Sequence, residues 1–205
     1  MTRVELKEKA KESLKGKWGE SIKIYLIYLL ISFVVGLVEG FILGLLNVSE
    51  QTSALLTDAT SLILSALFML GMASFYLKIA RNEEVTYKEL FSKTNMFVAT
   101  LLVMLLVYVF TFLWSLLFII PGIIAAISYS QVYYIMLDNP ELKTSEVVKM
   151  SKEMMKGHKM DYFLLTLSFL GWGILCLLTF GIGFLWLIPY MNVTTVNFYD
   201  SIRSK

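Results

Sequence analysis

The block Met96–Leu137 contains no charged residue over 42 consecutive positions. As a single α-helix it would be about 63 Å long, roughly twice the hydrocarbon thickness of a bilayer. Within a membrane, this block must therefore fold back once. Two sites could hold the turn: Trp114-Ser115, or Pro121-Gly122, whose Pro-Gly pair is the stronger turn signal although proline is also tolerated within membrane spans.

Apolar residues form two more spans and a second long block elsewhere in the chain. The first span is expected at about Ile22–Leu46, the second at about Ala54–Ile79, and the last block at about Tyr162–Tyr199. This last block has loop signals at Gly171–Gly173 and Thr179–Gly183. Folding at the second of these gives two short spans, and a re-entrant hairpin is the alternative. The sequence therefore predicts an all-α polytopic membrane protein with six transmembrane helices arranged as three hairpins.

The composition favours the same class, because 57% of the residues are hydrophobic and 17% are charged, whereas soluble proteins carry about 25% charged residues. A cleavable signal peptide is not expected, since Met1–Lys17 is charged throughout and the first apolar block is longer than a signal-peptide core. The single cysteine, Cys176, lies in an apolar block. It can form no intrachain disulfide and is expected to pack as a small apolar side chain.

The Lys and Arg residues, 18 in all, fall on one side of these predicted hairpins. Seven lie between residues 3 and 23, four between 78 and 93, five between 143 and 159, and two after residue 200. The three connections on the opposite side contain none. Because basic residues favour the cytoplasmic side of a membrane, both termini are predicted to be cytoplasmic.

A short motif, Lys-Glu-x-apolar, precedes each predicted hairpin, at Lys11–Leu14, Lys88–Phe91 and Lys152–Met155. An aromatic pair also closes each even-numbered span; these pairs are Phe75-Tyr76, Tyr133-Tyr134 and Phe198-Tyr199. We interpret this as a pseudo-threefold repeat within one membrane domain, residues 1–205, with units at about 2–80, 81–138 and 139–205. The alternative is that interface physics alone places Lys, Glu and aromatic residues at span ends.

Each unit is expected to begin with an amphipathic helix at the cytoplasmic membrane surface. Thr2 with Glu5, and Thr86 with Glu89, have the spacing of capping boxes. In the first of these helices, apolar residues recur every four positions, although a solvated, frayed terminus is the alternative. The candidate interfacial residues are Lys11, Lys15, Lys88, Lys152, Lys156 and His158. Their predicted partners are anionic lipid headgroups rather than nucleic acid, because the basic segments adjoin membrane spans.

Several stretches along nearly the whole chain resemble a known family. They are Lys15–Trp18, Ile119–Ile124, Leu137–Leu142, Met155–Lys159, Leu167–Trp172 and Gly181–Tyr190. With them the chain resembles a widespread bacterial family of six-span membrane proteins whose function is unknown. It is also distantly similar to the membrane domain of some glycerophosphodiester phosphodiesterases. The resemblance implies six spans and a bacterial cytoplasmic (inner) membrane, and it supplies no catalytic residues.

Glu39 is the main candidate for an intramembrane functional site, because ionisable residues within spans are costly and are often functional. It lies among Gly36, Gly40 and Gly44, a pattern that lets another helix approach closely. The carboxylate could bind a cation or a proton inside the bundle. Alternatively, it lies nearer the outer interface or is neutralised by a polar neighbour.

Polar residues in the fourth and sixth predicted spans form a second candidate set, represented by Gln131, Asn192 and Thr195. Asn192 and Thr195 share a helix face. These residues could line a polar cavity or serve as hydrogen bonds between helices, which contribute roughly 0.6 kcal/mol each. The only histidine, His158, has no nearby metal-binding partner in the sequence, and a structural role is the simpler interpretation.

No spacing of residues indicates an enzyme, a metal site or a cofactor, and none is expected. The sequence predicts a non-enzymatic membrane module that binds lipid or a partner protein. A membrane protein partner or a homo-oligomer would fit this reading. The alternative is a small permease or channel, with Glu39 and the polar residues of the fourth and sixth spans lining its path.

Overall fold

The computed structural model describes residues 1–203, which are largely helical and contain no strand. The helices, in chain order, are α1 (Arg3–Leu14), α2 (Trp18–Leu45), α3 (Glu50–Ala80), the 3-10 helices η1 (Tyr87–Phe91) and η2 (Thr94–Met96), α4 (Phe97–Leu117), α5 (Ile119–Ser128), α6 (Val132–Asp138), α7 (Thr144–Met154), α8 (Lys159–Leu167), α9 (Leu170–Leu178) and α10 (Phe184–Arg203). Lys205, counted among the basic residues above, lies outside the described residues.

Five helical segments among the described residues are long and apolar enough to cross a membrane. They are Trp18–Leu45, Glu50–Ala80, Tyr87–Leu117, Ile119–Asp138 and Lys159–Leu178. The prediction of an all-helical, membrane-type chain is confirmed at this level. Helix α10 is not among the five, and the sixth span stays a prediction. Its polar residues, several of them buried, explain its lower hydropathy.

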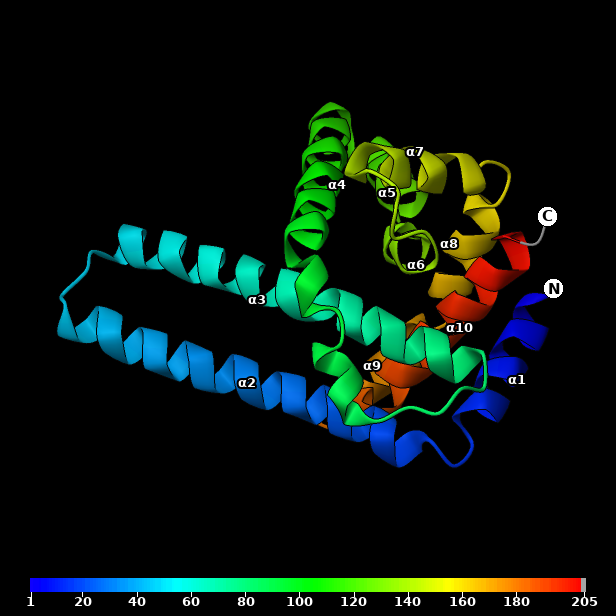
Figure 1. Cartoon of the computed structure of the whole chain (residues 1–205), viewed down its shortest axis with the longest axis horizontal. Helices are drawn as coiled ribbons and strands as arrows, with labels where there is room; N and C mark the ends of the chain where they lie inside the picture. The colour runs from blue at the N-terminus through cyan, green and yellow to red at the C-terminus, as the bar shows by residue number, and fades with distance from the viewer. Residues whose placement is uncertain (204–205) are drawn as a thin grey trace.

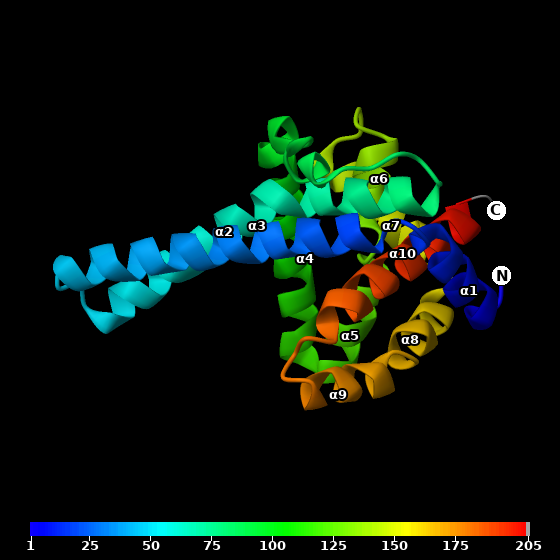
Figure 2. The ribbon, with the colours of Figure 1, turned by 90° about the horizontal axis from the view of Figure 1, so that it is seen from below.

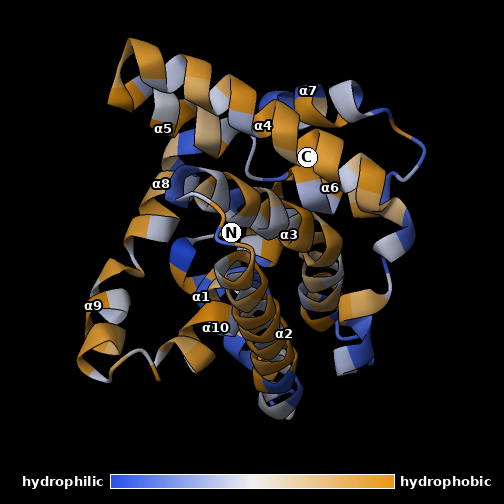
Figure 3. Ribbon diagram, turned by 90° about the vertical axis from the view of Figure 1, so that its left-hand side faces the viewer, coloured by the Kyte–Doolittle hydropathy of each residue, from blue (hydrophilic) through white to orange (hydrophobic). Residues whose placement is uncertain are grey.

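Three hairpins diverge from one region of the molecule, in which both termini lie (Figures 1 and 2). The hairpins are α2–α3, α4 with α5–α6, and α8–α9 with α10. We call the region where they meet the junction; it comprises α1, η1, α7 and the C-terminal ends of α3, α6 and α10. The main hydrophobic core lies here and includes Tyr76, Tyr134 and Tyr199. Hydrophobic residues cover most of α4 and α9 outside it (Figure 3).

The first hairpin extends far beyond the junction. At 1.5 Å per residue, α2 with 28 residues and α3 with 31 are about 42 and 46 Å long, more than the roughly 30 Å of a bilayer core. The connection between them turns at Asn47, whose φ is 48°, and the side chain of Ser49 accepts a hydrogen bond from the backbone N–H of Thr52 to begin α3. The most apolar part of α2 is not buried against the rest of the protein.

The second hairpin turns at Phe118, between the two predicted sites. Phe118 has extended backbone, with φ −161° and ψ 157°, and it separates α4 from α5. Pro121 fits in the first turn of α5, where a backbone N–H would have no helical partner. Gly122 faces Ser115 so closely that a Cβ would overlap its hydroxyl. Both predicted turn signals therefore lie at the crossing of α4 and α5, while the turn itself lies between them.

The third hairpin turns at Thr179–Gly183, as predicted. The Thr179 hydroxyl accepts a hydrogen bond from the Gly183 N–H at 2.9 Å, and Gly181 has a φ of 86° that suits glycine. A Cβ on Gly183 would lie 2.7 Å from the Cys176 sulfur, so this turn packs tightly onto α9. Cys176 is buried beside Leu187, in agreement with its predicted role as a small apolar side chain.

Two breaks interrupt the expected spans, and neither was predicted. Between α5 and α6, the Ser151 hydroxyl of α7 donates to the Ser128 carbonyl at 2.9 Å and accepts from the Gln131 N–H at 3.3 Å. Between α8 and α9, Lys7 Nζ lies 3.2 Å from the Ser168 carbonyl oxygen. Each break is stabilised by a polar side chain from a distant part of the chain, which satisfies the backbone groups that the break leaves without helical partners.

Helix α1 begins with the predicted capping box. The Glu5 N–H donates to the Thr2 hydroxyl at 3.3 Å, and the Thr2 N–H donates to the Glu5 carboxylate at 3.0 Å. Leu6, Ala10 and Leu14 are buried, as their spacing implies. They pack against α10 and α3, so the apolar face of α1 is covered by protein.

The second predicted capping box is wrong. Thr86 makes no capping hydrogen bond, and Tyr87–Phe91 forms a 3-10 helix. The Glu89 carboxylate instead accepts hydrogen bonds from Ser74, Lys78 and Ser92 at 2.7, 2.9 and 2.8 Å. These tertiary partners hold η1 against α3, where a Cβ on Gly71 would overlap the Leu90 carbonyl oxygen.

The connections α1–α2 and α7–α8 follow the same backbone path. Gly16 and Gly157 have φ values of 75° and 79°. The residues that follow them, Lys17 and His158, both have φ −112°, with ψ 1° and 0°. In the second unit, Lys93 stands at the position that corresponds to Gly16 and Gly157, so η1–η2 contains no such glycine.

Candidate functional site

The ends of α3, α6 and α10 are joined by a network of charged side chains around Asp138. Arg81 donates to both carboxylate oxygens of Asp138 at 2.8 Å and to Asp200 at 2.9 Å. Arg203 and the Tyr199 hydroxyl also donate to Asp138, at 2.6 and 2.9 Å. The Asp138 side chain is 8% exposed. With four donated hydrogen bonds, the buried carboxylate is fully satisfied, which marks a structural role.

Arg81 lies just outside the helical span that precedes it. Its hydrogen bonds to Asp138 and Asp200 raise the pKa of its guanidinium well above the ordinary value, so it stays charged throughout the accessible pH range. Sequence reasoning missed this network because its members are separated by 57 to 119 residues. The signal that could have found it is the placement of charged residues at the ends of all three even-numbered spans.

Glu39 lies in the outer part of the α2–α3 hairpin and accepts a hydrogen bond from the Thr60 hydroxyl at 3.0 Å. It borders an open hollow of about 340 Å³ lined mainly by aliphatic residues of α2. Asp58 lies two residues before Thr60 and is exposed. Glu39 lies about 32 Å along α2 from Trp18, at 1.5 Å per residue. The geometry therefore favours the polar-neighbour alternative for Glu39.

The glycines around Glu39 face no other helix of the described chain. A Cβ built on Gly36, Gly40 or Gly44 would have no atom within 4 Å. The predicted close helix approach at this stripe is thus not made within residues 1–203, and it stays a prediction for a partner or a second copy.

The polar residues of the fourth and sixth spans come only partly together. Asn192 and Thr195 hydrogen-bond to carbonyls of their own helix, at 2.9 Å each. Gln131 is fully buried at the break between α5 and α6, and its Nε2 donates to Ser130 at 2.7 Å. The Ser130 hydroxyl donates in turn to the Ile127 carbonyl at 2.8 Å. Most of these bonds therefore stay within one helix or its flanking turn.

Four buried side-chain atoms in the described chain have no hydrogen-bond partner. Three of them are Tyr76 Oη of α3, Gln131 Oε1 at the start of α6, and Asn197 Oδ1 of α10. The fourth is the hydroxyl of Thr111 on α4. Buried polar atoms of this kind are rare and call for a bound water or another polar group.

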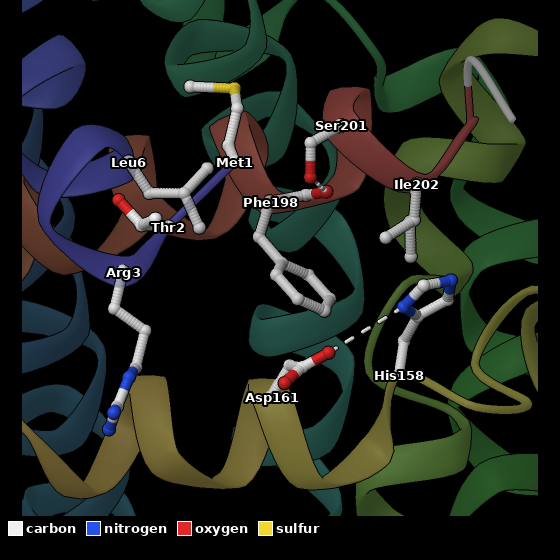
Figure 4. A pocket seen from close by; sticks show the side chains of 9 residues that line it. All are labelled: Met1, Thr2, Arg3, Leu6, His158, Asp161, Phe198, Ser201 and Ile202. Carbon is white, nitrogen blue, oxygen red and sulfur yellow. Dashed lines mark hydrogen bonds and ion pairs between the residues drawn. The ribbon is translucent and has the colours of Figure 1, made fainter.

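The predicted interfacial lysines are all exposed: Lys11, Lys15, Lys88, Lys152 and Lys156. None of them has a carboxylate within ion-pair distance among residues 1–203. His158 borders a cavity of about 340 Å³ between α1, α8 and α10. Its ring faces Asp161, with Nδ1 3.8 Å from the carboxylate, and the Phe198 ring points into the space beside them (Figure 4).

Helix α1 also carries a row of cations that sequence reasoning did not separate from its other lysines. Arg3, Lys7 and Lys11 are four residues apart and share one face. Lys7 Nζ lies 4.1 Å from the centre of the Phe169 ring, and Lys11 Nζ lies 5.7 Å from that of Tyr190. Partial burial and the neighbouring charges of Lys11 and Arg3 lower the pKa of Lys7. None of the three cations has an ion-pair partner among residues 1–203, although Glu8 of the same helix lies near Tyr190 as well.

Comparison with protein families matches the whole chain, in two overlapping parts, residues 1–128 and 116–205, to the family described as "Protein of unknown function (DUF975)". The chain belongs to this family. No curated protein and no solved structure showed a significant match.

Among its described residues, this DUF975 chain has no group of three or more His, Cys, Asp and Glu side chains that could hold a metal ion. What its geometry offers chemically is non-covalent. The cations of α1 that form no ion pair can attract anions, and the apolar hairpin surfaces can contact lipid.

Proposed function

We propose that the chain is a six-span protein of the bacterial cytoplasmic membrane, with both termini in the cytoplasm, and that it acts as a non-enzymatic module binding bilayer lipid. The proposed orientation is supported by the basic residues. No Lys or Arg lies in residues 24–77, 94–142 or 160–202, the stretches that form the hairpins. The basic residues that remain flank the junction, which would face the cytoplasm.

The proposed sixth span is α10. It has 20 residues, long enough to cross the bilayer core, and runs from the turn at Thr179–Gly183 back to the junction. It packs against α1, α2, α3 and α9, and two of its polar residues, Thr194 and Asn197, are fully buried. A span shielded by protein in this way tolerates a lower hydropathy than one surrounded by lipid.

Packing at the junction supports the proposed threefold repeat. Each element that introduces a hairpin packs against the helix that closes the preceding unit: η1 against α3, α7 against α6, and α1 against α10. Because α1 belongs to the first unit and α10 to the third, the last of these contacts closes the three units into a ring. The matching turns at Gly16 and Gly157 add a second similarity, between the first and third units.

Lipid binding is the function that the geometry supports best, and the observation that carries it is the divergence of the hairpins (Figures 1 and 2). No residue in the most apolar part of α2 is buried within the protein, and that of the α8–α9 segment is only 17% buried. In a bilayer, lipid chains would fill the spaces between the hairpins. A transport path needs polar groups that continue across the bilayer, whereas Asn192, Thr194 and Thr195 of α10 bond to backbone carbonyls of their own helix.

The small permease or channel is the second candidate, and one observation favours it. Unpartnered polar atoms lie buried on α3, α6 and α10, the three helices that converge at the junction. The permease hypothesis also assigns Glu39 to the path. Glu39 lies in the outer part of the first hairpin, away from these atoms.

Reconstitution distinguishes the two candidates. After extensive washing in mild detergent, the purified protein is expected to retain several phospholipids per chain, measured by phosphorus assay and native mass spectrometry. Liposomes containing it are expected to leak protons, K⁺ and a small neutral solute no faster than protein-free liposomes. Flux above that background that falls in Glu39→Gln or Gln131→Leu would support the permease, and loss of all bound phospholipid would contradict the lipid-binding module.

A further inference from the structure

An aromatic groove lies where the third hairpin meets the N-terminal part of the chain. Its volume is about 370 Å³, within the roughly 300–1,000 Å³ typical of small-molecule sites. Its walls are apolar and come from α2, α9 and α10; the main lining residues are Trp18, Trp172, Leu175, Trp186, Leu187 and Tyr190. Three of the four tryptophans of the chain are among them.

One end of this groove is cationic. Lys11 lines it directly, and Lys7 and Arg3 continue the same face of α1. None of the three has an ion-pair partner among residues 1–203. At the other end are Thr179 and Gly183 of the outer turn, so charge is confined to the end beside the junction.

This asymmetry matches one kind of occupant. A lipid with an anionic headgroup has a negative phosphate and a long apolar chain, which complement the cations of α1 and the aromatic walls in that order. Tryptophan and tyrosine are also the residues enriched at the headgroup level of membranes. A helix of a second protein would need an acidic side chain placed beside the cationic row in addition to apolar side chains at the walls, whereas an anionic lipid combines both in one molecule.

We propose that the groove holds one anionic phospholipid of the cytoplasmic leaflet, with an acyl chain along Trp172, Leu175 and Trp186 and the phosphate at Lys11. Lys7 and Arg3 raise the positive potential at the phosphate. Lys7 also donates a hydrogen bond to the Ser168 carbonyl at the break between α8 and α9. This inference rests on the proposed lipid-binding function and specifies the lipid class and its site.

The groove tryptophans report on the lipid beside them. In a Trp114→Phe background, every remaining tryptophan lines the groove, because Trp114 lies on α4. The protein is reconstituted into phosphatidylcholine vesicles that contain a small fraction of phospholipid with brominated acyl chains, which quench tryptophan fluorescence on contact. The brominated lipid is phosphatidylglycerol in one series and phosphatidylcholine in the other.

Brominated phosphatidylglycerol is expected to reach half-maximal quenching at a several-fold lower mole fraction than brominated phosphatidylcholine. Lys11→Gln is expected to reduce this preference about fivefold, the effect of one basic residue at an anionic membrane surface. Lys11→Arg should keep the preference. Lys9→Gln is the matched control, because it removes the same charge from the opposite face of α1.

Equal quenching by the two lipids would overturn the inference, and so would an equal loss of preference in Lys9→Gln and Lys11→Gln. If washed protein retains phospholipid but shows no headgroup preference, the anionic site fails and the lipid-binding module stands. If washed protein retains no phospholipid, the proposed function itself fails.

Discussion

The junction and the outer part of the α2–α3 hairpin are both helical, but they differ in what stabilises them. At the junction, Phe75, Tyr76 and Tyr199 are at most 1% exposed. In the outer hairpin, Phe41 and Leu46 are each 69% exposed. The chain therefore determines the packing of the junction through its own contacts, whereas the outer hairpin depends on the surrounding lipid for burial of its apolar side chains.

Acidic residues show the same contrast. At the junction, Asp138 accepts four hydrogen bonds and Glu89 accepts three, all from other side chains. In the outer hairpin, Glu39 accepts one, from Thr60. A carboxylate with many fixed donors defines how helices meet, while one with a single donor does not. Substitutions should therefore have graded effects, largest at the Asp138 network and smallest at Glu39.

The largest effect is expected for Asp138→Asn. The substitution leaves Arg81 and Arg203 without their shared counter-ion and gives the Tyr199 hydroxyl a weaker acceptor. Breaking a buried ion pair typically costs 3–5 kcal/mol, and the partial exposure of both arginines points to the low end, about 3 kcal/mol. Thermal unfolding in detergent, followed by fluorescence, measures the loss.

Asp161→Asn is the control for this prediction, because the Asp161 side chain is 69% exposed and lies 3.8 Å from His158. Its expected effect is within about 0.5 kcal/mol. Equal unfolding temperatures for the two variants would show that the Asp138 network does not hold the three helix ends together.

An intermediate effect is expected for added methyl groups at two tight glycines. In Gly71→Ala, the new Cβ meets the backbone of η1 at Leu90, which the bonds of Glu89 hold in place. In Gly122→Ala, it meets Ser115 near the outer end of a hairpin, where the two helices can move apart. We expect losses of about 2 and 1 kcal/mol in the free energy of unfolding, within the range of overpacking.

The double variant Ser115→Ala/Gly122→Ala tests the second site, since removing the hydroxyl should recover part of the loss. A larger loss at Gly122 than at Gly71 would reverse the ranking of the two regions.

Much of the fold could be predicted from the sequence, because local patterns determine it. The capping box at Thr2, the buried face of α1 and the turn at Thr179–Gly183 all depend on residues close together in the chain. The site residues were predicted less well. Thr86 and Glu89 have capping-box spacing, but Ser74 and Lys78 of α3 bind Glu89 more effectively in the folded protein. Tertiary partners of this kind leave no trace in a local window.

The helix breaks were missed for a related reason. A continuous apolar run predicts a continuous span, and the break after Ser128 is tolerated only because Ser151 of α7 satisfies its backbone groups. The cost of an ionisable residue within a span singles out Glu39, but the same argument applies to Asp58 of the second predicted span. Both residues lie in the part of the α2–α3 hairpin that is far from the junction.

The smallest effect is expected for Glu39→Gln. The amide oxygen of glutamine can still accept the hydrogen bond of Thr60, and the site is open to its surroundings, so the free energy of unfolding should change by less than about 0.5 kcal/mol. Glu89→Gln is the matched substitution at the junction, where the lost charge faces Lys78 at 2.9 Å and one acceptor oxygen becomes a donor. It should lose at least about 1 kcal/mol, since hydrogen bonds to charged groups contribute about 1.5–3 kcal/mol. Thermal unfolding of the two variants side by side measures the difference. A loss at Glu39 as large as that at Glu89 would mean that the outer hairpin is held by contacts of its own, and the contrast with the junction would fail.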